Sequence, residues 1–153
     1  MKKSDRITAL VGRLASGPAT ALDPHYTGYF TCFNAGQYYE AHDVLEHLWL
    51  QCRDANAFFY KGLIQIAGAF VHLQKQHLHP HHPKHATRLR PAVRLFALGA
   101  KNLAPFSPRH LGLDVAALLA RCASLAEKII AAEYTRNPWQ PAHLPQIELM
   151  GQR

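Results

Sequence analysis

Acidic residues are absent between Asp54 and Asp114. This gap contains only basic charged residues, namely Lys61, Lys75, Lys84, Arg88, Arg90, Arg94, Lys101 and Arg109. The whole chain has a formal net charge of +7. Such asymmetry indicates either a solvated basic helix or an anionic partner, for example nucleic acid, phosphate or an acidic protein surface. No known nucleic-acid-binding motif accompanies the basic residues, which favours the solvated helix.

Cysteine is scarce, since the chain has three, at Cys32, Cys52 and Cys122. They are widely spaced and form no Cys-x-x-Cys pair. This pattern argues against a disulfide framework and against a cysteine zinc site, and it favours a reducing compartment. A cysteine on the apolar side of a helix usually serves as a small core residue.

Long hydrophobic runs are also lacking. The first apolar run is interrupted at Gly12 and Arg13, which is too early for a signal peptide. The most apolar later stretch, residues 57–73, contains a lysine, a glutamine and a histidine, which makes it too polar for a membrane span. We therefore expect a cytoplasmic protein with no membrane partner.

What the sequence does contain is helical periodicity. The chain has 153 residues, 48% of them hydrophobic and 18% charged, which fits one globular domain over residues 1–153. The spacing predicts helices at about 4–15, 23–33, 37–53, 57–77, 84–103 and 115–133. Residues 134–153 have three prolines and little periodicity, so we expect an extended arm that packs over the bundle or onto a partner. The predicted fold is an all-α, single-domain bundle of five or six helices with an extended C-terminal tail.

Local signals mark several helix ends. Asp23-Pro24 has the form of an N-cap followed by proline at the first helical position, and Leu113-Asp114 opens a later helix. Gly36 can take the left-handed conformation that closes a helix. Pro91 either kinks the helix of 84–103 or marks its true start. The helix of 57–77 is apolar nearly all round and is expected to be central.

The helix of 37–53 carries polar residues on two opposite faces. One face holds Glu40, Asp43, His47 and Gln51, and we interpret it as the solvent face. The other holds His42, Glu46 and Arg53, flanked by Tyr39 and Trp49. If the helix packs by this second face, its carboxylate needs a cation, a hydrogen-bond donor or a metal ion.

The helix of 57–77 has a matching polar stripe formed by Lys61, Gln65, Gly68, His72 and Lys75. The stripe is either a narrow window onto water or one wall of a pocket facing His42 and Glu46. In the second case His42, Glu46 and His72 form a three-ligand set for a divalent metal such as zinc. Gln65 and Lys61 would then support catalysis by His42 and Glu46, and Tyr39, Trp49, Arg53 and His72 would line the pocket.

Three interpretations of this polar set stay open, namely a structural hydrogen-bond network, a small-molecule or anion pocket, and a metal site. The spacing lacks a known catalytic sequence such as His-Glu-x-x-His. A separate tract, "HLHPHHPKH" at 77–85, holds His77, His79, His81, His82 and His85. Such tracts bind metals weakly, and its two prolines make it a loop.

The blocks "FNAGQYYEAHDVLEHLW", "YKGLIQIAGAFVHL" and "GLDVAALLA" resemble domain-of-unknown-function family 309 over about residues 23–131. The positions that carry the resemblance are Phe33, Asn34, Gly36, Tyr39, Glu40, His42, Asp43, Glu46, Trp49, Gly62, Leu63, Ile64, Gln65 and His72. The resemblance implies a small all-helical bundle, without implying an activity. This chain departs from the family at its histidine tract, which is therefore interpreted as a local elaboration.

Among these positions, Asn34 and Gly36 lie at the corner before the helix of 37–53, and Glu40 lies in its first turn. A carboxylate in the first turn complements the helix N-terminus, so we assign these three a structural role.

Two classes of function remain open. A binding or scaffold protein, with the His/Glu pocket as structure or ligand site, is favoured because no catalytic set is complete. The alternatives are a metal-dependent or His/Glu acid–base hydrolase, and anion or nucleic-acid binding through Arg88, Arg90, Arg94 and Lys101. The aromatic residues and the tail are compatible with a homodimer.

Overall fold

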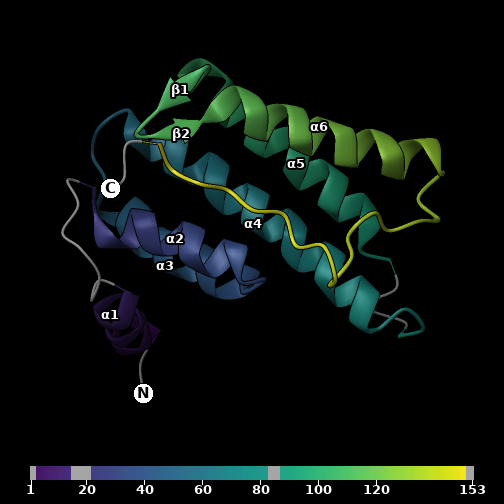
Figure 1. Ribbon diagram of the computed structural model, residues 1–153, viewed down its shortest axis with the longest axis horizontal. Coiled ribbons are helices and arrows are strands. Elements are labelled where there is room, and N and C mark those ends of the chain that lie inside the picture. Colours follow the sequence, from purple (N-terminus) through teal and green to yellow (C-terminus); the bar gives the residue numbers. More distant parts are fainter. Residues whose placement is uncertain (1–2, 15–21, 83–86, 151–153) are drawn as a thin grey trace.

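The computed structural model describes residues 3–14, 22–82 and 87–150. Within these ranges it contains six α-helices and almost no strand, which confirms the prediction of an all-α bundle (Figure 1). The helices are α1 (Lys3–Leu14), α2 (Pro24–Asn34), α3 (Tyr38–Gln51), α4 (Asn56–Leu78), α5 (Leu89–Leu103) and α6 (Val115–Ala131). No helix in the described ranges is long and apolar enough to cross a membrane.

Helix ends follow the local signals in the sequence. Asp23 caps α2 by accepting a 2.7 Å hydrogen bond from the backbone N–H of His25, and Pro24 is the first helical residue. Asp114 caps α6 in the same way through the N–H of Ala117, at 2.9 Å. Gly36 has a φ of 75°, the left-handed conformation that was predicted to close α2.

The start of α5 differs from the predicted residue 84. Arg88 is the N-cap, and Pro91 lies in the first turn, where its missing N–H removes no helical hydrogen bond. Of the two interpretations of Pro91, the start of the helix therefore applies. The predicted first residues of this helix, 84–86, lie outside the described residues, and they include His85. The predicted end of the first helix, at 15–18, also lies outside them.

The connection between α5 and α6 was predicted as a loop and contains short regular elements. A turn of 3₁₀ helix, η1 (Ala104–Phe106), leads to strands β1 (Arg109–His110) and β2 (Leu113–Asp114). The strands pair antiparallel, with Arg109 opposite Asp114 and His110 opposite Leu113. Two residues are too few for an alternating pattern, so the sequence carried no signal for them.

Helix α4 lies between α3 and α5, in the central position expected for the most apolar helix (Figure 1). On the α3 side, Phe70 packs edge-on against Phe33, with ring centroids 4.9 Å apart, and stacks with Tyr38 at 5.1 Å. On the α5 side, Gly62 and Gly99 face each other and let the two backbones approach closely. The core therefore forms around α4, and α3 is held against it by aromatic packing.

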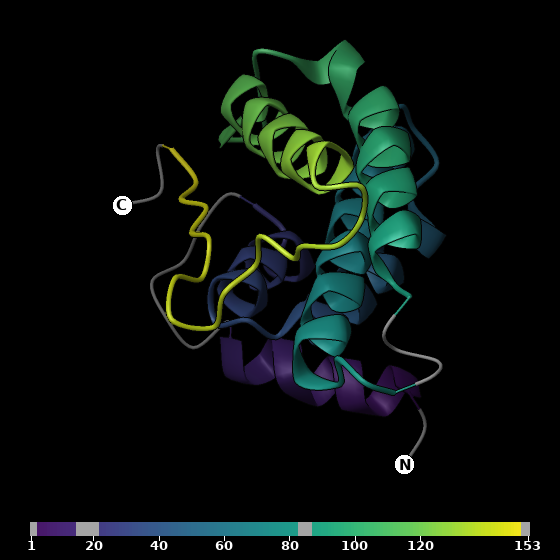
Figure 2. The ribbon, with the colours of Figure 1, turned by 90° about the vertical axis from the view of Figure 1, so that its right-hand side faces the viewer.

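The chain after α6 forms an extended arm, residues 135–150, without helix or strand. It crosses the bundle over α4 and ends near β2 (Figure 1), and the turned view shows it passing between α2 and the pair α5 and α6 (Figure 2). Trp139 and Ile147 are buried in the core, at 4% and 8% exposure. Of the two placements expected for the tail, packing over its own bundle is the one observed.

Candidate binding groove beside α3

Helix α3 buries a different face from the one that the sequence suggested. Tyr38, Ala41 and Leu45 are fully buried against the core, whereas His42 and Glu46 are half-buried at 33% and 27% side-chain exposure. Arg53 is exposed and Trp49 is half-buried. The predicted inward-facing His42/Glu46/Arg53 face is therefore the rim of the bundle, because the large apolar residues on the neighbouring face take the core position.

The face assigned to solvent is partly covered by α1. Val44 is fully buried against Ile7 and Val11, with Leu10 packed beside them. Asp43, on this face, has only 15% side-chain exposure. The assignment of Asp43 to solvent was therefore wrong, since one short amphipathic helix packs on this side of α3. Glu40 and Gln51 on the same face are exposed, and His47 is half-buried.

Lys3 of α1 joins the polar residues of α3 into one network. Its Nζ atom lies 2.7 Å from Oε1 of Glu46 and 3.4 Å from Oδ1 of Asp43. His42 Nδ1 lies 3.2 Å from the same Asp43 oxygen and 3.9 Å from Oε2 of Glu46. The hydrogen bond to Glu46 is the largest of the effects that raise the pKa of Lys3, and partial burial opposes it. Both carboxylates therefore have a cationic partner on α1.

The polar stripe of α4 contacts α5 through His72 and Gln65, and its Lys75 lies over the Tyr39 ring of α3. His72 Nδ1 lies 3.0 Å from Nη1 of Arg88, and Gln65 Oε1 accepts a 2.7 Å hydrogen bond from Asn102. Burial lowers the pKa of His72, and the charges of Arg88 and Lys75 lower it further. This arrangement favours a neutral His72 ring that accepts a hydrogen bond from Arg88.

The expected pocket between α3 and α4 is therefore not assembled from these residues. Among the described residues, no three His, Cys, Asp and Glu side chains are placed to share a metal ion. The set His42, Glu46 and His72 is divided between a network with α1 and a contact with α5. Lys61 is exposed at the edge of the stripe. Helical spacing placed each stripe correctly on its own helix, but it could not say which neighbour each stripe meets.

The basic residues of α5 do not act as one free surface. Arg88 contacts His72, and Arg90 lies over the Tyr134 ring at 4.0 Å from its centroid. Arg94 and Lys101 are exposed. Two of the four residues predicted to bind anions therefore have contacts within the bundle.

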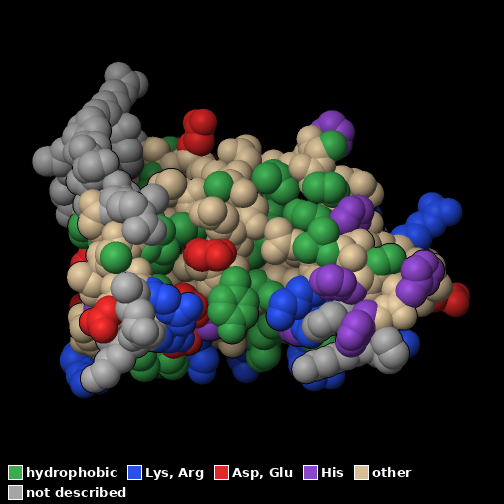
Figure 3. All heavy atoms as spheres, turned by 90° about the horizontal axis from the view of Figure 1, so that it is seen from below, with side chains coloured by type: hydrophobic (Ala, Val, Ile, Leu, Met, Phe, Trp, Pro, Cys, Tyr) green, Lys and Arg blue, Asp and Glu red, His purple; other side chains and the backbone are tan. Residues whose placement is uncertain are grey.

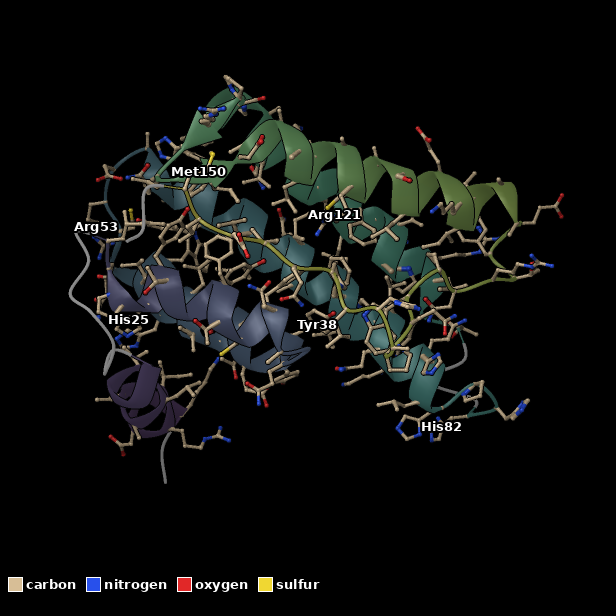
Figure 4. All side chains as sticks on the ribbon, in the orientation of Figure 1. His25, Tyr38, Arg53, His82, Arg121 and Met150 are labelled. Atoms are coloured by element: carbon tan, nitrogen blue, oxygen red, sulfur yellow. The ribbon has the colours of Figure 1, made fainter. Side chains whose placement is uncertain are left out.

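The corner residues of the family motif contact the C-terminal arm. Asn34 exchanges two hydrogen bonds with the backbone of Ile147, and Leu144 packs over Gly36 at the position a Cβ would take. Gln74 also donates a 2.9 Å hydrogen bond to the carbonyl of Gly36. Tyr38 lies beside the arm (Figure 4) and accepts a 2.9 Å hydrogen bond from Trp139 Nε1. No local sequence pattern indicates these partners in the arm.

A histidine pair near the start of α2 was also missed. The rings of His25 and His47 stack at 4.6 Å, with 11° between their planes. His25 Nδ1 lies 3.1 Å from the capping carboxylate of Asp23, and His25 Nε2 is buried without a partner in the described chain. Figure 4 places His25 beside α1. The residues are 22 positions apart, so no local spacing links them.

A groove opens between α1 and the first turns of α3. Its volume is about 480 Å³, and its lining comprises Lys3, Arg6, Ile7, Ala9, Leu10, Gln37, Tyr39, Glu40 and Asp43. Tyr39 is 59% exposed, which is high for an aromatic side chain. The view from the α1 side shows acidic and basic side chains mixed at the α1 end of the molecule, with histidines gathered at the opposite end (Figure 3). The groove thus combines an apolar wall with charges of both signs.

Fold and groove together define a small all-α bundle with a mixed-charge groove beside α3. The family model described as Domain of unknown function (DUF309) matches residues 26–81, which confirms the predicted resemblance over nearly all of α2, α3 and α4. The matched residues do not include helices α1, α5 and α6, the predicted third block at 112–120, or the arm. No curated protein and no solved structure matches the chain.

Proposed function

We propose that this chain is a binding protein and that its ligand site is the groove between α1 and α3. The observation that carries the proposal is the mixed-charge lining of a cavity of about 480 Å³. This volume lies within the range of roughly 300–1,000 Å³ that is usual for small-molecule sites. The apolar wall formed by Ile7, Ala9 and Leu10 can bury the body of a ligand while the charged groups orient it.

The ligand class follows from the groove charges that form no ion pair among the described residues. Lys3 and Asp43 belong to the network with Glu46, so their charges are largely compensated. Arg6 and Glu40 line the same groove and form no ion pair within the described part of the chain. A guanidinium binds a carboxylate or phosphate, and a carboxylate binds an ammonium group. The groove is therefore suited to a small zwitterion that carries an amine and an acidic group.

Tyr39 supports this proposal from the rim of the groove. Its ring is 59% exposed, and Lys75 Nζ lies 5.6 Å from the ring centroid on the α4 side. An exposed aromatic ring provides a flat surface for the apolar or cationic part of a ligand.

The test is a titration of the full chain with free amino acids, in which two-dimensional NMR monitors binding. The matched probes are the methyl esters, which lack the carboxylate, and the N-acetyl forms, which lack the amine. We expect shifts confined to α1 and the first turns of α3, and weaker binding of both derivatives. Arg6→Met and Glu40→Gln should each lower the affinity at least tenfold, whereas Arg94→Met on α5 should bind as the wild type. The melting temperature should stay unchanged in Arg6→Met and fall only slightly in Glu40→Gln, which loses a carboxylate in the first turn of α3. Absence of shifts at millimolar ligand, or binding unaffected by Arg6→Met and Glu40→Gln, would contradict the proposal.

A second candidate is acid–base chemistry at His42, supported by the contact of its Nδ1 with Asp43 at 3.2 Å. A carboxylate that holds one ring nitrogen leaves the other to act as a base. This candidate predicts hydrolysis of small esters or phosphates that is abolished in His42→Ala and retained in His82→Ala. Equal rates in the two variants would remove it.

A further inference from the structure

The C-terminal arm covers a surface of the bundle, here called its seat, that includes Asn34, Tyr38, Leu73, Gly112 and Arg121. The arm binds this seat mainly through its backbone. Asn34 donates from Nδ2 to the carbonyl of Ile147 at 2.8 Å and accepts from its N–H at 2.7 Å. Arg121 donates to the carbonyl of Gln146, and the N–H of Met150 donates to the carbonyl of Gly112, at 2.8 and 2.7 Å. Three of these four bonds are made with bundle side chains and one with a bundle backbone group, and together they fix the register of the extended arm through its own backbone.

Two of the arm's side chains, Trp139 and Ile147, are buried in this seat. Trp139 is 4% exposed, and its Nε1 donates to Tyr38. Ile147 is 8% exposed and belongs to the core cluster. A second polar contact lies at the start of the arm, where Asn137 donates a 2.7 Å hydrogen bond to the carbonyl of Leu73. The bundle therefore presents a specific binding surface for residues 137–150.

The far half of the arm is bordered on both sides by hollows that open to the surface. Cavities of about 140 Å³ and 390 Å³ flank it, and Ile147 and Glu148 line both. The first cavity lies against α6 and includes Arg121, and the second lies against α2 and includes Asn34. In this half the arm therefore lies in a surface groove with open space on both sides, while Ile147 inserts into the core.

The hinge between α6 and the arm holds a costly conformation. Glu133 and Tyr134 are consecutive and have φ values of 54° and 60°. This left-handed conformation is unfavourable for residues with a Cβ, and the strain is largest for bulky ones. The hydrogen bonds from the N–H groups of Glu133 and Tyr134 to Ile130 and Ile129, and the stacking of Arg90 on Tyr134, hold the turn. An extended hinge would remove the strain at the cost of these contacts.

We propose that the arm exchanges between two copies of this chain, so that each bundle binds residues 137–150 of the other. Every contact of the seat is kept in such a dimer, because the two copies are identical. Only the hinge changes, from a left-handed turn to an extended connection. Strained hinges between a domain and an exchangeable segment favour this form of assembly. This inference stands apart from the ligand groove, which lies on the α1 side of α3.

The experiment mixes unlabelled and ¹⁵N-labelled full-length chains at high concentration and analyses them by size-exclusion chromatography and native mass spectrometry. We expect a dimer of mixed isotopic composition that persists for hours after dilution, because the arm must detach before it can return. The Trp139 indole N–H should stay protected from hydrogen exchange in the dimer. A dimer that dissociates at once on dilution, or a chain that stays monomeric, would overturn the proposal.

Hinge variants provide the directional test. Removing Glu133 and Tyr134 deletes the left-handed turn and up to about 7 Å of chain, and we expect this loss to keep the arm from returning to its own seat. We expect this variant to be dimeric at every concentration, with Trp139 protected. Glu133→Gly/Tyr134→Gly relaxes the strain and should lower the dimer fraction several-fold, whereas Arg90→Ala removes the stacking on Tyr134 and should raise it. A monomeric deletion variant, or point variants that shift the dimer fraction in the opposite directions, would reject the exchange.

Discussion

Asn34 binds both backbone groups of Ile147, donating to its carbonyl at 2.8 Å and accepting from its N–H at 2.7 Å, although 113 positions separate them. Asn34 ends α2, and Ile147 lies near the end of the arm. An asparagine side chain has the donor and the acceptor needed to copy a backbone amide. One side chain of the family-matched segment thus fixes the register of the arm.

Replacing Asn34 with alanine should destabilise the folded chain by about 2 kcal/mol, because it leaves a part-buried N–H and carbonyl of Ile147 without a partner. Urea unfolding measures the loss, and hydrogen exchange at the Ile147 N–H should accelerate at the same time. The matched control is Asn102→Ala, which removes a single side-chain contact with Gln65 and should cost less than about 1 kcal/mol. Equal losses in the two variants would show that Asn34 has no special role in holding the arm.

Local chemistry explains what the sequence could predict. The Asp23-Pro24 cap, the Asp114 cap and the left-handed Gly36 depend on residues within one helical turn, and all three were predicted. The central position of α4 followed from its apolar circumference in the same way. Each of these features is a property of one short segment, so no knowledge of its neighbours was required.

Pairings between helices could not be obtained in this way. Helical periodicity places Asp43 on the opposite face of α3 from His42 and Glu46. In the structure α1 covers the side of Asp43, and Lys3 of α1 binds both Asp43 and Glu46. Likewise His72 lies on the polar stripe of α4, and only the packing of α5 brings Arg88 to it. Both pairings depend on how two helices lie relative to each other in space. Helical periodicity describes one helix at a time and does not contain this information.

Gly62→Ala and Gly12→Ala should change stability in opposite directions. A Cβ on Gly62 would lie 2.8 Å from Cγ of Leu103 and 3.1 Å from the carbonyl oxygen of Gly99, so α4 and α5 would have to separate. We expect a loss of about 1–3 kcal/mol. A Cβ on Gly12 meets nothing within 4 Å on an exposed helical position, and the substitution should stabilise the chain by about 0.5–1 kcal/mol. Thermal unfolding compares the two, and a Gly62→Ala variant as stable as the wild type would contradict the close helix contact.

His72 should make the chain less stable in acid. Its pKa is lowered from 6.5, first by burial and then by the charges of Arg88 and Lys75. The unfolded chain therefore takes up a proton at His72 that the folded chain binds less readily. The stability contributed by neutral His72 is present above pH 6.5 and is lost as the pH falls below that value.

The measurement is the free energy of unfolding in urea between pH 7.5 and 5, for the wild type, His72→Gln and His82→Gln. His72→Gln should flatten the decline, and His82→Gln, at an exposed position, should leave it unchanged. Part of the decline will remain, because burial also lowers the pKa of His110. Identical slopes in all three proteins would rule out His72 as a source of the acid sensitivity.

The three free thiols should differ in reactivity according to their burial. Burial raises the pKa of Cys122 to about 12 and that of Cys32 to about 11, and both side chains are almost inaccessible, at 2% and 1% exposure. Cys52 is half-buried at the end of α3 and is the reactive one, although burial also raises its pKa. Because the thiolate is the reacting form, an aromatic disulfide reagent at pH 8 should modify one thiol in the folded chain and three in denaturant. Cys52→Ser should reduce the folded count to none, and rapid modification of Cys32 or Cys122 in that variant would mean that the α2 and α6 sides of the core open far more readily than their packing indicates.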